Sequence, residues 1–311
     1  MRALVSDLRH AFRAFGRAPG FTGAAVLSLA IGVGVNTSIY SVASALLLRP
    51  LPYADAERLT ILWNRSPGLG ISEDWFSTAQ YFDIKNGAQS FEAVAIAIGG
   101  NYNLTADGGE PERIGTIRVS SGLLPMLGVQ PLLGRLNTAD EDSAGAAGVA
   151  LLNYGTWARR YGGDASVVGR RIELNGQPYD IVGVLPQTFS LPREILPTLG
   201  GAEEAEMIVS LPLSAEAPTI RTGEDYNILA KLQRGVGVEQ AQAELDALTA
   251  RLRRDHPEVY PPNGGLTFGV VPLREQVVGD VRWPLIVLMG ASRSTGAPAA
   301  LGIPYFRGRK E

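Results

Sequence analysis

The sequence predicts an α+β protein: a mixed-sheet domain with packed helices, preceded by an amphipathic helix and one transmembrane α-helix. Three observations support this fold class. The stretch from Phe21 to Leu48 contains no charged residue and no histidine. After it, short runs rich in β-branched residues alternate with runs of helical period. The pair Asn175-Gly176 lies between two alternating runs and predicts a β-hairpin, since both central residues of a type I′ turn need positive φ.

Residues 1–20 are predicted to form an amphipathic helix at the cytoplasmic face of a membrane. Leu and Phe recur at helical spacing between Leu4 and Phe15, while Arg9, Arg13 and Arg17 repeat every four residues on another face. The arginine face suits the anionic headgroups of a lipid bilayer, and the apolar face suits the acyl boundary. The alternative is a helix docked on a cytoplasmic protein.

Residues 21–48 are predicted to cross the bilayer. A membrane core about 30 Å thick needs roughly 20 apolar residues in a helix, and this stretch has 28 residues. Residues 1–20 carry a net charge of +3, whereas residues 49–282 hold 20 Lys or Arg against 29 Asp or Glu. Because short basic flanks stay in the cytoplasm, the N-terminus is predicted inside and the long acidic part outside.

A cleaved signal peptide is the alternative interpretation of this stretch. Ala43-Ser44-Ala45 has the small-x-small form of a cleavage site, and cleavage there would release a soluble domain. Against cleavage, the apolar run is about twice as long as the usual signal-peptide core and continues past the site through Leu48. We therefore predict a single membrane pass.

One face of this helix is a candidate helix-packing surface. Ser28, Gly32 and Asn36 follow one another at intervals of four residues and so share a face. Small residues let another helix approach closely, and the Asn36 amide could donate across the contact. We name Gly32 and Asn36 as the packing residues. The alternative is a lone helix in which local hydrogen bonds satisfy Asn36.

Residues 49–282 are predicted to form one domain of strands and helices. Asn153 is placed to cap a helix over 154–161 that ends at Gly162-Gly163, with Trp157 and Tyr161 as core anchors. A longer helix begins at Val238, and its apolar stripe should pack on a sheet. Strands are expected at 58–63, 93–98, 113–119, 149–152, 226–233 and 266–272.

The residues that carry chemistry in enzymes are missing or scattered. The chain has no cysteine, no Gly-Lys pair for a P-loop, and no basic run with aromatics for nucleic acid. Asp140-Glu141-Asp142 lacks two ligands of a calcium loop and is expected to be a solvated loop. Glu203-Glu204 are neighbours in a polar loop. We predict no catalytic, cofactor-binding or metal-binding residue and no cofactor.

The last part of the chain, residues 283–311, combines an aborted apolar run with a polar tail. The run from Trp283 to Ala291 opens like a second membrane helix, but nine residues cannot cross a bilayer. The remaining residues are basic and interrupted by Pro and Gly, without periodicity. This tail is predicted to be disordered.

Several long motifs occur in an order that points to one family. They are PGFTGAAVLSLAIGVGVNTSIYSVASALLLRPLPYADAERL, NYGTWARRYGGDASVVGRRIELNGQPYDIVGVLP, LQRGVGVEQAQAELDALTARLRR and VVPLREQVVGDVR. Over roughly residues 7–290 the chain resembles the MacB-like (FtsX-type) permeases of ABC transporters. It looks most similar to the branch called acidobacterial duplicated orphan permeases.

The resemblance implies a role as well as a fold. Residues 49–282 would be the periplasmic core domain of a permease in the cell inner membrane. Such permeases are thought to pass motion from a separate ATPase to the periplasm without catalysis. Their partners would be other permease helices or a second permease copy, the ABC ATPase and a periplasmic adaptor.

The chain departs from the family near Ala291, where such permeases continue into a complete second helix and a segment that contacts the ATPase. A truncated or frameshifted permease is therefore expected, with a natural short protein as the alternative. A single-pass, membrane-anchored periplasmic binding or adaptor module is the alternative function. A third interpretation is an exported enzyme, and no group of residues in the sequence supports it.

Overall fold

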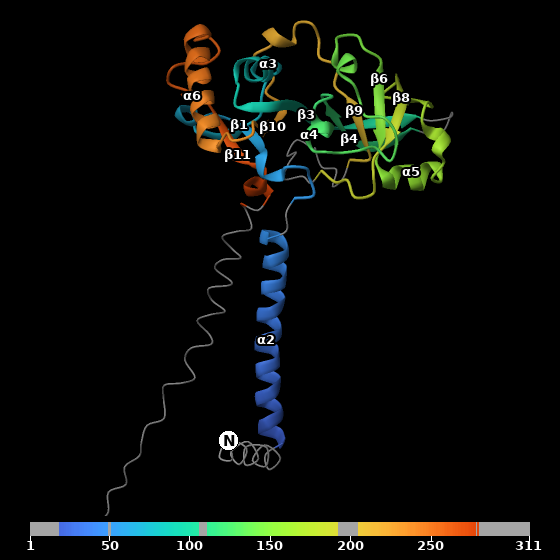
Figure 1. Ribbon diagram of the computed structural model, residues 1–311, viewed down its shortest axis with the longest axis vertical. Coiled ribbons are helices and arrows are strands. Elements are labelled where there is room, and N and C mark those ends of the chain that lie inside the picture. Colours follow the sequence, from blue (N-terminus) through green and yellow to red (C-terminus); the bar gives the residue numbers. More distant parts are fainter. Residues whose placement is uncertain (1–18, 49–50, 106–110, 192–204, 278, 280–311) are drawn as a thin grey trace, which may run out of the picture. The chain divides into compact units, whose positions relative to one another are not determined.

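The computed structural model describes residues 19–48, 51–105, 111–191, 205–277 and 279. The chain divides into two compact units, one made of residues 1–49 and 278–311 and the other of residues 50–277 (Figure 1). We describe each unit by itself. The predicted amphipathic helix, the Glu203-Glu204 pair and the tail after residue 282 lie outside the described residues.

The first unit contains helix α2, Pro19–Leu48, which covers the uncharged stretch of the sequence. Six of its described apolar side chains are each more than half exposed, from 58% at Ile31 and Val33 to 76% at Phe21. Among the described residues, no helix meets the combined length and apolarity expected of a membrane span. The crossing of the bilayer by residues 21–48 therefore stays a prediction.

The second unit is built on one mixed sheet of 11 strands (Figure 1). Its main path runs β11-β1-β10-β3-β4-β9-β6-β8-β5, with β2 paired to β1 and β7 paired to β3 and β8. The pairs β4 with β9 and β6 with β8 are parallel, and the other pairs are antiparallel. The strands are β1 (Leu59–Ser66), β2 (Ile71–Asp74), β3 (Phe91–Thr105), β4 (Glu112–Val119), β5 (Leu133–Gly134), β6 (Gly148–Leu152), β7 (Arg171–Leu174), β8 (Gln177–Val184), β9 (Met207–Ser210), β10 (Asn227–Leu232) and β11 (Thr267–Pro272).

One end of the sheet is covered by helices, and we call it the helix-covered lobe. It contains β11, β1, β2, β10 and the first half of β3, with α3 (Thr78–Gly87) and α6 (Val238–Asp255) packed on one face. The apolar stripe of α6 buries Ala241, Leu245, Leu248 and Leu252 against sheet residues such as Phe268. The predicted packing of this helix on a sheet is confirmed.

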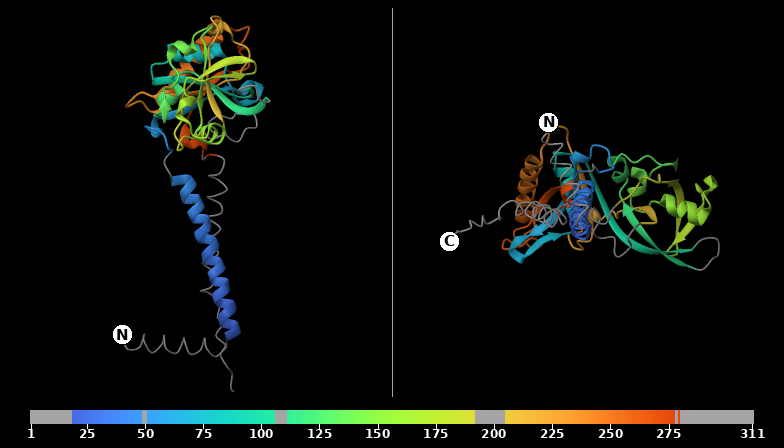
Figure 2. Two further views of the ribbon diagram at one scale, coloured as in Figure 1. Left: turned by 90° about the vertical axis from the view of Figure 1, so that its right-hand side faces the viewer. Right: turned by 90° about the horizontal axis from the view of Figure 1, so that it is seen from below.

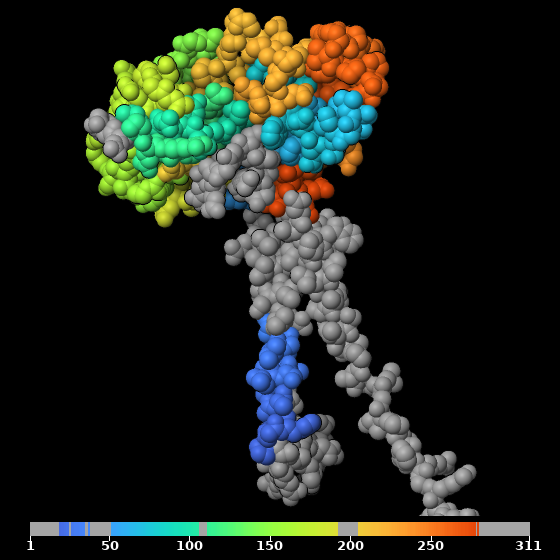
Figure 3. Space-filling view, turned by 180° about the vertical axis from the view of Figure 1, so that it is seen from behind, coloured from blue at the N-terminus to red at the C-terminus, as the bar shows by residue number. Residues whose placement is uncertain are grey.

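The other end of the sheet closes into a small barrel. The strands β3, β4, β9, β6, β8 and β7 form a ring, because β7 pairs both with β8 and with the end of β3 at Leu104 and Thr105. The long strand β3, teal in Figure 2, runs from the helix-covered lobe into this barrel. The two lobes lie at opposite ends of the domain, with α6 in orange and the barrel in yellow-green (Figure 3).

Besides the core under α3 and α6 and the core of the barrel, a third core lies on the opposite face of the sheet from α3 and α6. We call it the junction-side core, because the chain enters and leaves the domain there. It contains alternate residues of β1 and β10, the short helix α4 (Leu123–Met126) and the loop after β8. Leu51 and Tyr53, at the start of the domain, and Leu273, at its end, pack in it. Its buried members include Leu59, Ile61, Trp63, Ile117, Leu124, Leu151, Leu185, Ile208, Leu229 and Leu273.

The strongest local signals of the sequence are confirmed. Asn175 and Gly176 have φ of 51° and 74° and form the turn between β7 and β8. Asn153 caps α5 (Tyr154–Tyr161) by accepting the Thr156 N–H at 2.7 Å, and Gly162 ends this helix with φ of 62°. Trp157 and Tyr161 pack against the barrel core.

Five helices or strands were not expected from the sequence: α3, β9, β2, β5 and α4. Helix α3 has almost no hydrophobic periodicity, yet Ser77 and Gln80 form a reciprocal capping box at its start. Strand β9 is only 4 residues long and entirely buried, so it shows no alternation. The 139–142 stretch is also not the solvated loop that we expected, because it forms a short 3-10 helix and Asp142 is half-buried against Ser121.

Candidate functional site

The predicted helix-packing face lies on α2. Gly32 is exposed, and a Cβ atom built there would meet nothing within 4 Å. The side chain of Asn36 lies outside the described part of the chain. The pairing of these two residues with another helix therefore stays a prediction.

Residues 51–58, which follow α2 in the sequence, make several hydrogen bonds and ion pairs with the rest of the domain, and we call them the junction segment. It ends in a 3-10 turn, Ala56–Arg58, that leads directly into β1. Asp55, just before this turn, has φ of 49°, a left-handed conformation that is uncommon for any residue except Gly. Asp and Asn adopt this conformation more often than other non-glycine residues do.

Four charged side chains supply contacts on one side of the junction segment. The Lys231 ammonium lies 2.9 Å from an Asp55 carboxylate oxygen and 3.9 Å from Glu92. Arg58 pairs with Asp55 at 3.1 Å, pairs with Glu92, and donates to the carbonyl of Leu232 at 2.9 and 2.6 Å. Hydrogen bonding from Lys231 holds the pKa of Asp55 below its ordinary value, and Arg58 does the same for Glu92.

Lys231 is unusual in its position. It is 8% exposed and belongs to β10, a strand in which every residue is buried. An ammonium group is costly to bury unless a carboxylate neutralises it, so Asp55 and Glu92 compensate a charge that the strand could not otherwise hold.

Two loops of the junction-side core supply further contacts. The Tyr53 hydroxyl donates to the carbonyl of Ser190 at 2.7 Å, in the loop after β8. The Ala54 N–H donates to the carbonyl of Leu127 at 3.1 Å, just after α4. Burial raises the pKa of the Tyr53 phenol, so this hydroxyl remains a donor throughout the physiological range.

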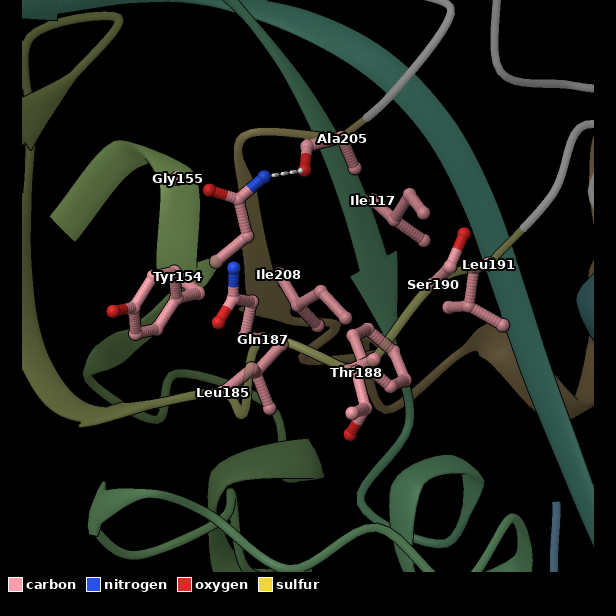
Figure 4. Close-up of a pocket in the computed structure, with 12 residues that line it drawn as sticks. Ile117, Tyr154, Gly155, Leu185, Gln187, Thr188, Ser190, Leu191, Ala205 and Ile208 are labelled. Atoms are coloured by element: carbon pink, nitrogen blue, oxygen red, sulfur yellow. Dashed lines mark hydrogen bonds between the residues drawn. The ribbon is translucent and has the colours of Figure 1, made fainter. Parts of the chain in front are cut away.

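A cavity of about 320 Å³ lies beside this contact (Figure 4). The loop from Gln187 to Leu191 forms part of its wall, with Ile117 and Ile208 from the sheet and Tyr154 and Gly155 from α5. Asn153 also lines the cavity, and its side chain donates to the Ala205 carbonyl at 2.7 Å. Among the described residues, the lining of the cavity holds no carboxylate, histidine or lysine, and Tyr154 is the one side chain there of a type that acts as a general acid or base.

Two acidic residues of the 139–142 stretch, Glu141 and Asp142, hold the local structure together. Asp142 accepts three hydrogen bonds from Ser121, at 3.0, 2.9 and 2.7 Å, while burial raises its pKa. Glu141 closes a capping box with Thr138 and pairs with Arg135 at 2.6 Å. Within the described ranges, no group of three or more His, Cys, Asp or Glu side chains is arranged to hold a metal ion.

Comparison with known proteins identifies the family. The model of the MacB-like periplasmic core domain matches residues 22–248. This chain belongs to the MacB-like periplasmic core domain family. The motif resemblance described above is thereby confirmed at the level of the family, while its acidobacterial branch stays a prediction.

Two solved structures of other proteins show a similar fold. A domain of a protein described as a permease from Porphyromonas gingivalis aligns with 20% identity and a TM-score of 0.51, covering 71% of this chain and 92% of that one. The periplasmic region of MacB from Actinobacillus actinomycetemcomitans aligns with 12% identity and a TM-score of 0.50, covering 76% and 98%. Among curated proteins, no sequence matches this chain.

The MacB-like domain uses residues that sequence reasoning missed. Asp55, Arg58 and Lys231 are far apart in the chain, and no short motif connects them. One signal was present: Lys231 is one of only three lysines, and it interrupts the apolar strand Asn227–Leu232. A charged residue inside a buried strand is expected to pair with a residue of opposite charge. Which residue forms that pair is known only from the structure.

Proposed function

We propose that this chain is a non-catalytic permease subunit of a MacB-like ABC transporter, which carries motion between a separate ATPase and a periplasmic domain without a cofactor. Residues 21–48 cross the inner membrane once, with the N-terminus in the cytoplasm and the MacB-like domain in the periplasm. The observation that carries this proposal is the family match, which begins at residue 22 and so includes α2 with the domain.

The charge distribution and the surface of α2 support the same topology. The four arginines before α2 favour a cytoplasmic N-terminus. The described apolar side chains on α2 are exposed, and apolar surface of this kind is stable when lipid or another helix covers it. The ion pair of Lys231 with Asp55 holds the start of the domain, seven residues after the last residue of α2, against strand β10.

The topology can be tested by labelling single cysteines, because the chain has none of its own. Arg2→Cys and Glu239→Cys are produced separately in cells and treated from outside with a membrane-impermeant maleimide after the outer membrane is opened. We expect labelling at residue 239 and none at residue 2 until the cells are lysed. Labelling of residue 2 in intact cells would contradict the proposed orientation.

The proposed partner of α2 is a second copy of the chain or another permease helix that packs on the face of Gly32 and Asn36. Gly32→Cys should form a disulfide-linked dimer in oxidised membranes when the partner is a second copy. Gly34→Cys is the matched control, since it lies about 200° around the helix. Equal crosslinking at both positions would exclude this face as a specific contact between copies.

Coupling to the ATPase is tested by measuring ATP hydrolysis, and coupling to a periplasmic adaptor is tested by looking for a specific periplasmic binding partner. Purified chain in proteoliposomes is combined with a separately produced MacB-type ATPase domain, and ATP hydrolysis is measured with and without the chain. A changed rate is expected of a working permease subunit, and an unchanged rate is expected of a truncated permease. An unchanged rate, together with a specific periplasmic binding partner, would instead favour a membrane-anchored adaptor module.

A further inference from the structure

A cavity of about 340 Å³ lies beside helix α3, and we call it the α3 cavity. Helix α3 forms one wall and contributes Tyr81, Phe82 and Lys85. The 142–144 segment forms a second wall, and residues of the 211–218 segment form a third. All of these residues belong to the unit of residues 50–277, so the cavity lies within one unit.

Hydrogen bonds connect the three walls. The Thr78 hydroxyl of α3 donates to the Ala217 carbonyl at 2.8 Å. The Leu213 N–H donates to the Asp142 carbonyl at 3.1 Å. The Asp142 side chain in turn accepts from the N–H and the hydroxyl of Ser121. The walls therefore hold one another in place without a ligand, and most small-molecule sites are preformed in this way.

Lys85 and Asp142 are the two charged residues of the lining, and their charges are opposite. Lys85 is exposed, and its ammonium lies 5.3 Å from the centre of the Tyr81 ring. Among the described residues, no carboxylate forms an ion pair with this ammonium. Burial raises the pKa of Asp142, while the Ser121 hydrogen bonds and the charge of Lys85 act in the opposite direction. The two groups are thus close enough to interact through the cavity but do not pair directly.

Most of the remaining lining is apolar. Leu211 is buried in the core under α3 and α6, and Phe82 and Leu213 are partly buried beside that core. Ser143 and Ser214 add two hydroxyl groups at exposed positions. An apolar surface with a few polar groups of fixed position is the usual composition of a site for a small organic molecule.

We propose that the α3 cavity binds a small zwitterion with an apolar side chain, of the class of free apolar amino acids. The Lys85 ammonium binds the carboxylate of the ligand, and Asp142 accepts from its ammonium group. Phe82, Leu211 and Leu213 contact its side chain. A ligand with one charge would be repelled by one of the two charged residues, whereas a zwitterion matches both. This site gives the domain a ligand beyond its proposed part in transport and does not depend on that part.

The site is tested by isothermal titration calorimetry of L-leucine into the full chain in lipid nanodiscs. L-Leucinamide lacks the carboxylate, and N-acetyl-L-leucine lacks the ammonium group, so each analogue removes one of the two charge contacts. We expect each analogue to bind at least roughly tenfold more weakly than leucine, because a hydrogen bond to a charged group is lost. Absence of leucine binding, or equal binding of the three compounds, would overturn the proposal.

Lys85→Met tests the carboxylate contact at an exposed position, where the substitution should leave the fold intact. Leucine should bind this variant at least roughly tenfold more weakly than it binds the unchanged protein. Leucinamide should bind it no more weakly, since it has no carboxylate to lose. Lys85→Arg keeps the positive charge and should retain leucine binding to within roughly threefold. An unchanged leucine affinity in Lys85→Met contradicts the assigned role of this lysine.

Asp142→Asn tests the ammonium contact. Leucine should bind this variant more weakly than it binds the unchanged protein, whereas N-acetyl-leucine should bind it no more weakly. Asp142 also accepts from Ser121, so a thermal melt first shows whether the variant folds. If it does not fold, the comparison of leucine with N-acetyl-leucine on the unchanged protein decides this contact.

Arg171→Met is the matched control. Arg171 lines a different cavity, of about 380 Å³, and pairs there with Asp180 at 2.9 Å. This variant should bind leucine as the unchanged protein does, and a loss as large as that of Lys85→Met would overturn the assignment to the α3 cavity. The titrations need no ATPase and no transport. A failed topology or ATPase test therefore leaves their result intact, and a failed leucine titration leaves the proposed function standing.

Discussion

The two lobes of the domain differ in how the backbone hydrogen-bonding groups at the edges of their sheets are satisfied. The barrel closes on itself through the contact of β7 with β3, so its strands have few free backbone groups. The helix-covered lobe ends in an open strand, β11, whose outer edge could pair with another chain. Strand β3 belongs to both lobes, so a single strand takes part in a closed barrel and in an open sheet. The open sheet needs side chains to cover the backbone groups at its edge strand, β11.

The protection of β11 comes from one residue of α6. The Gln242 side chain donates to the Phe268 carbonyl at 2.8 Å and accepts the Val270 N–H at 2.9 Å. These are the two hydrogen bonds that a neighbouring strand would make. Asp246 accepts from Gln242 at 2.9 Å and from the Thr267 hydroxyl at 3.0 Å, which fixes the amide in this position.

The largest expected effect is that of Phe268→Ala in the helix-covered lobe. Phe268 is fully buried and packs edge-on against Phe76, with ring centroids 5.1 Å apart. We expect a loss of about 3–5 kcal/mol of unfolding free energy by urea denaturation. Because β3 is shared, the fluorescence of Trp157 in the barrel should follow the same transition as far-UV circular dichroism, measured after the other three tryptophans are replaced by Phe. Two separate transitions would show that the lobes fold independently.

Gln242→Ala sharpens the comparison of edges. The substitution leaves the outward backbone groups of Phe268 and Val270 without their side-chain partner, and we expect a loss of about 1–3 kcal/mol. The exposed edge should also promote association, measured as concentration-dependent dimers by analytical ultracentrifugation. Gln240→Ala, at an exposed position of the same helix, is the control and should remain monodisperse. Equal behaviour of the two variants would mean that Gln242 does not protect the edge.

A smaller effect is expected in the barrel at the hairpin between β7 and β8. Gly176→Ala forces a side chain into φ of 74° and should cost about 1 kcal/mol. Gly155→Ala in α5 makes the same chemical change at a helical position, where the nearest atom to a new Cβ lies 3.7 Å away. That control should be neutral or stabilising by roughly 0.5–1 kcal/mol in thermal melts. The hypothesis fails when both variants shift the melt equally.

The smallest effect concerns two glutamates of the helix-covered lobe, Glu224 and Glu244, whose pKa values are shifted in opposite directions. Burial raises the pKa of Glu224, which accepts from Asn64 at 2.7 Å and Gln80 at 3.1 Å. A carboxyl whose folded pKa is raised favours folding less as the pH rises through it. Glu224→Gln should therefore stabilise the protein at pH 7, by less than about 1 kcal/mol after solvent screening, and this gain should vanish under acid.

Glu244 provides the opposite sign. Burial raises its pKa, but the N–H groups of Gln89 and Ser90 outweigh that effect, so the pKa lies below its ordinary value. Its contribution is present above the unfolded pKa and is lost as the pH falls through the folded value. Glu244→Gln should destabilise the protein at pH 7 and have little effect under acid. Melting curves of both variants between pH 3 and pH 8 check the two signs.

Prediction from sequence succeeded where a few neighbouring residues settle the backbone. Asn175-Gly176, the Asn153 cap and the stripe of α6 are each complete within one short segment, so their signals survive without tertiary contacts. Helix α3 was missed although the Ser77–Gln80 capping box is a local signal, because the apolar residues of the helix show almost no helical periodicity. Asp142 was misplaced because its partner, Ser121, lies 21 residues away.

By itself, the sequence determined the uncharged stretch of α2, the charge asymmetry around it, the local helices and hairpin, and the family through its motifs. Only the tertiary structure decided the closure of the barrel, the protection of β11 and the fastening of the junction segment. The physical reason is distance along the chain. Leu104 meets Leu174, and Asp55 meets Lys231, through contacts whose partners no local pattern can specify.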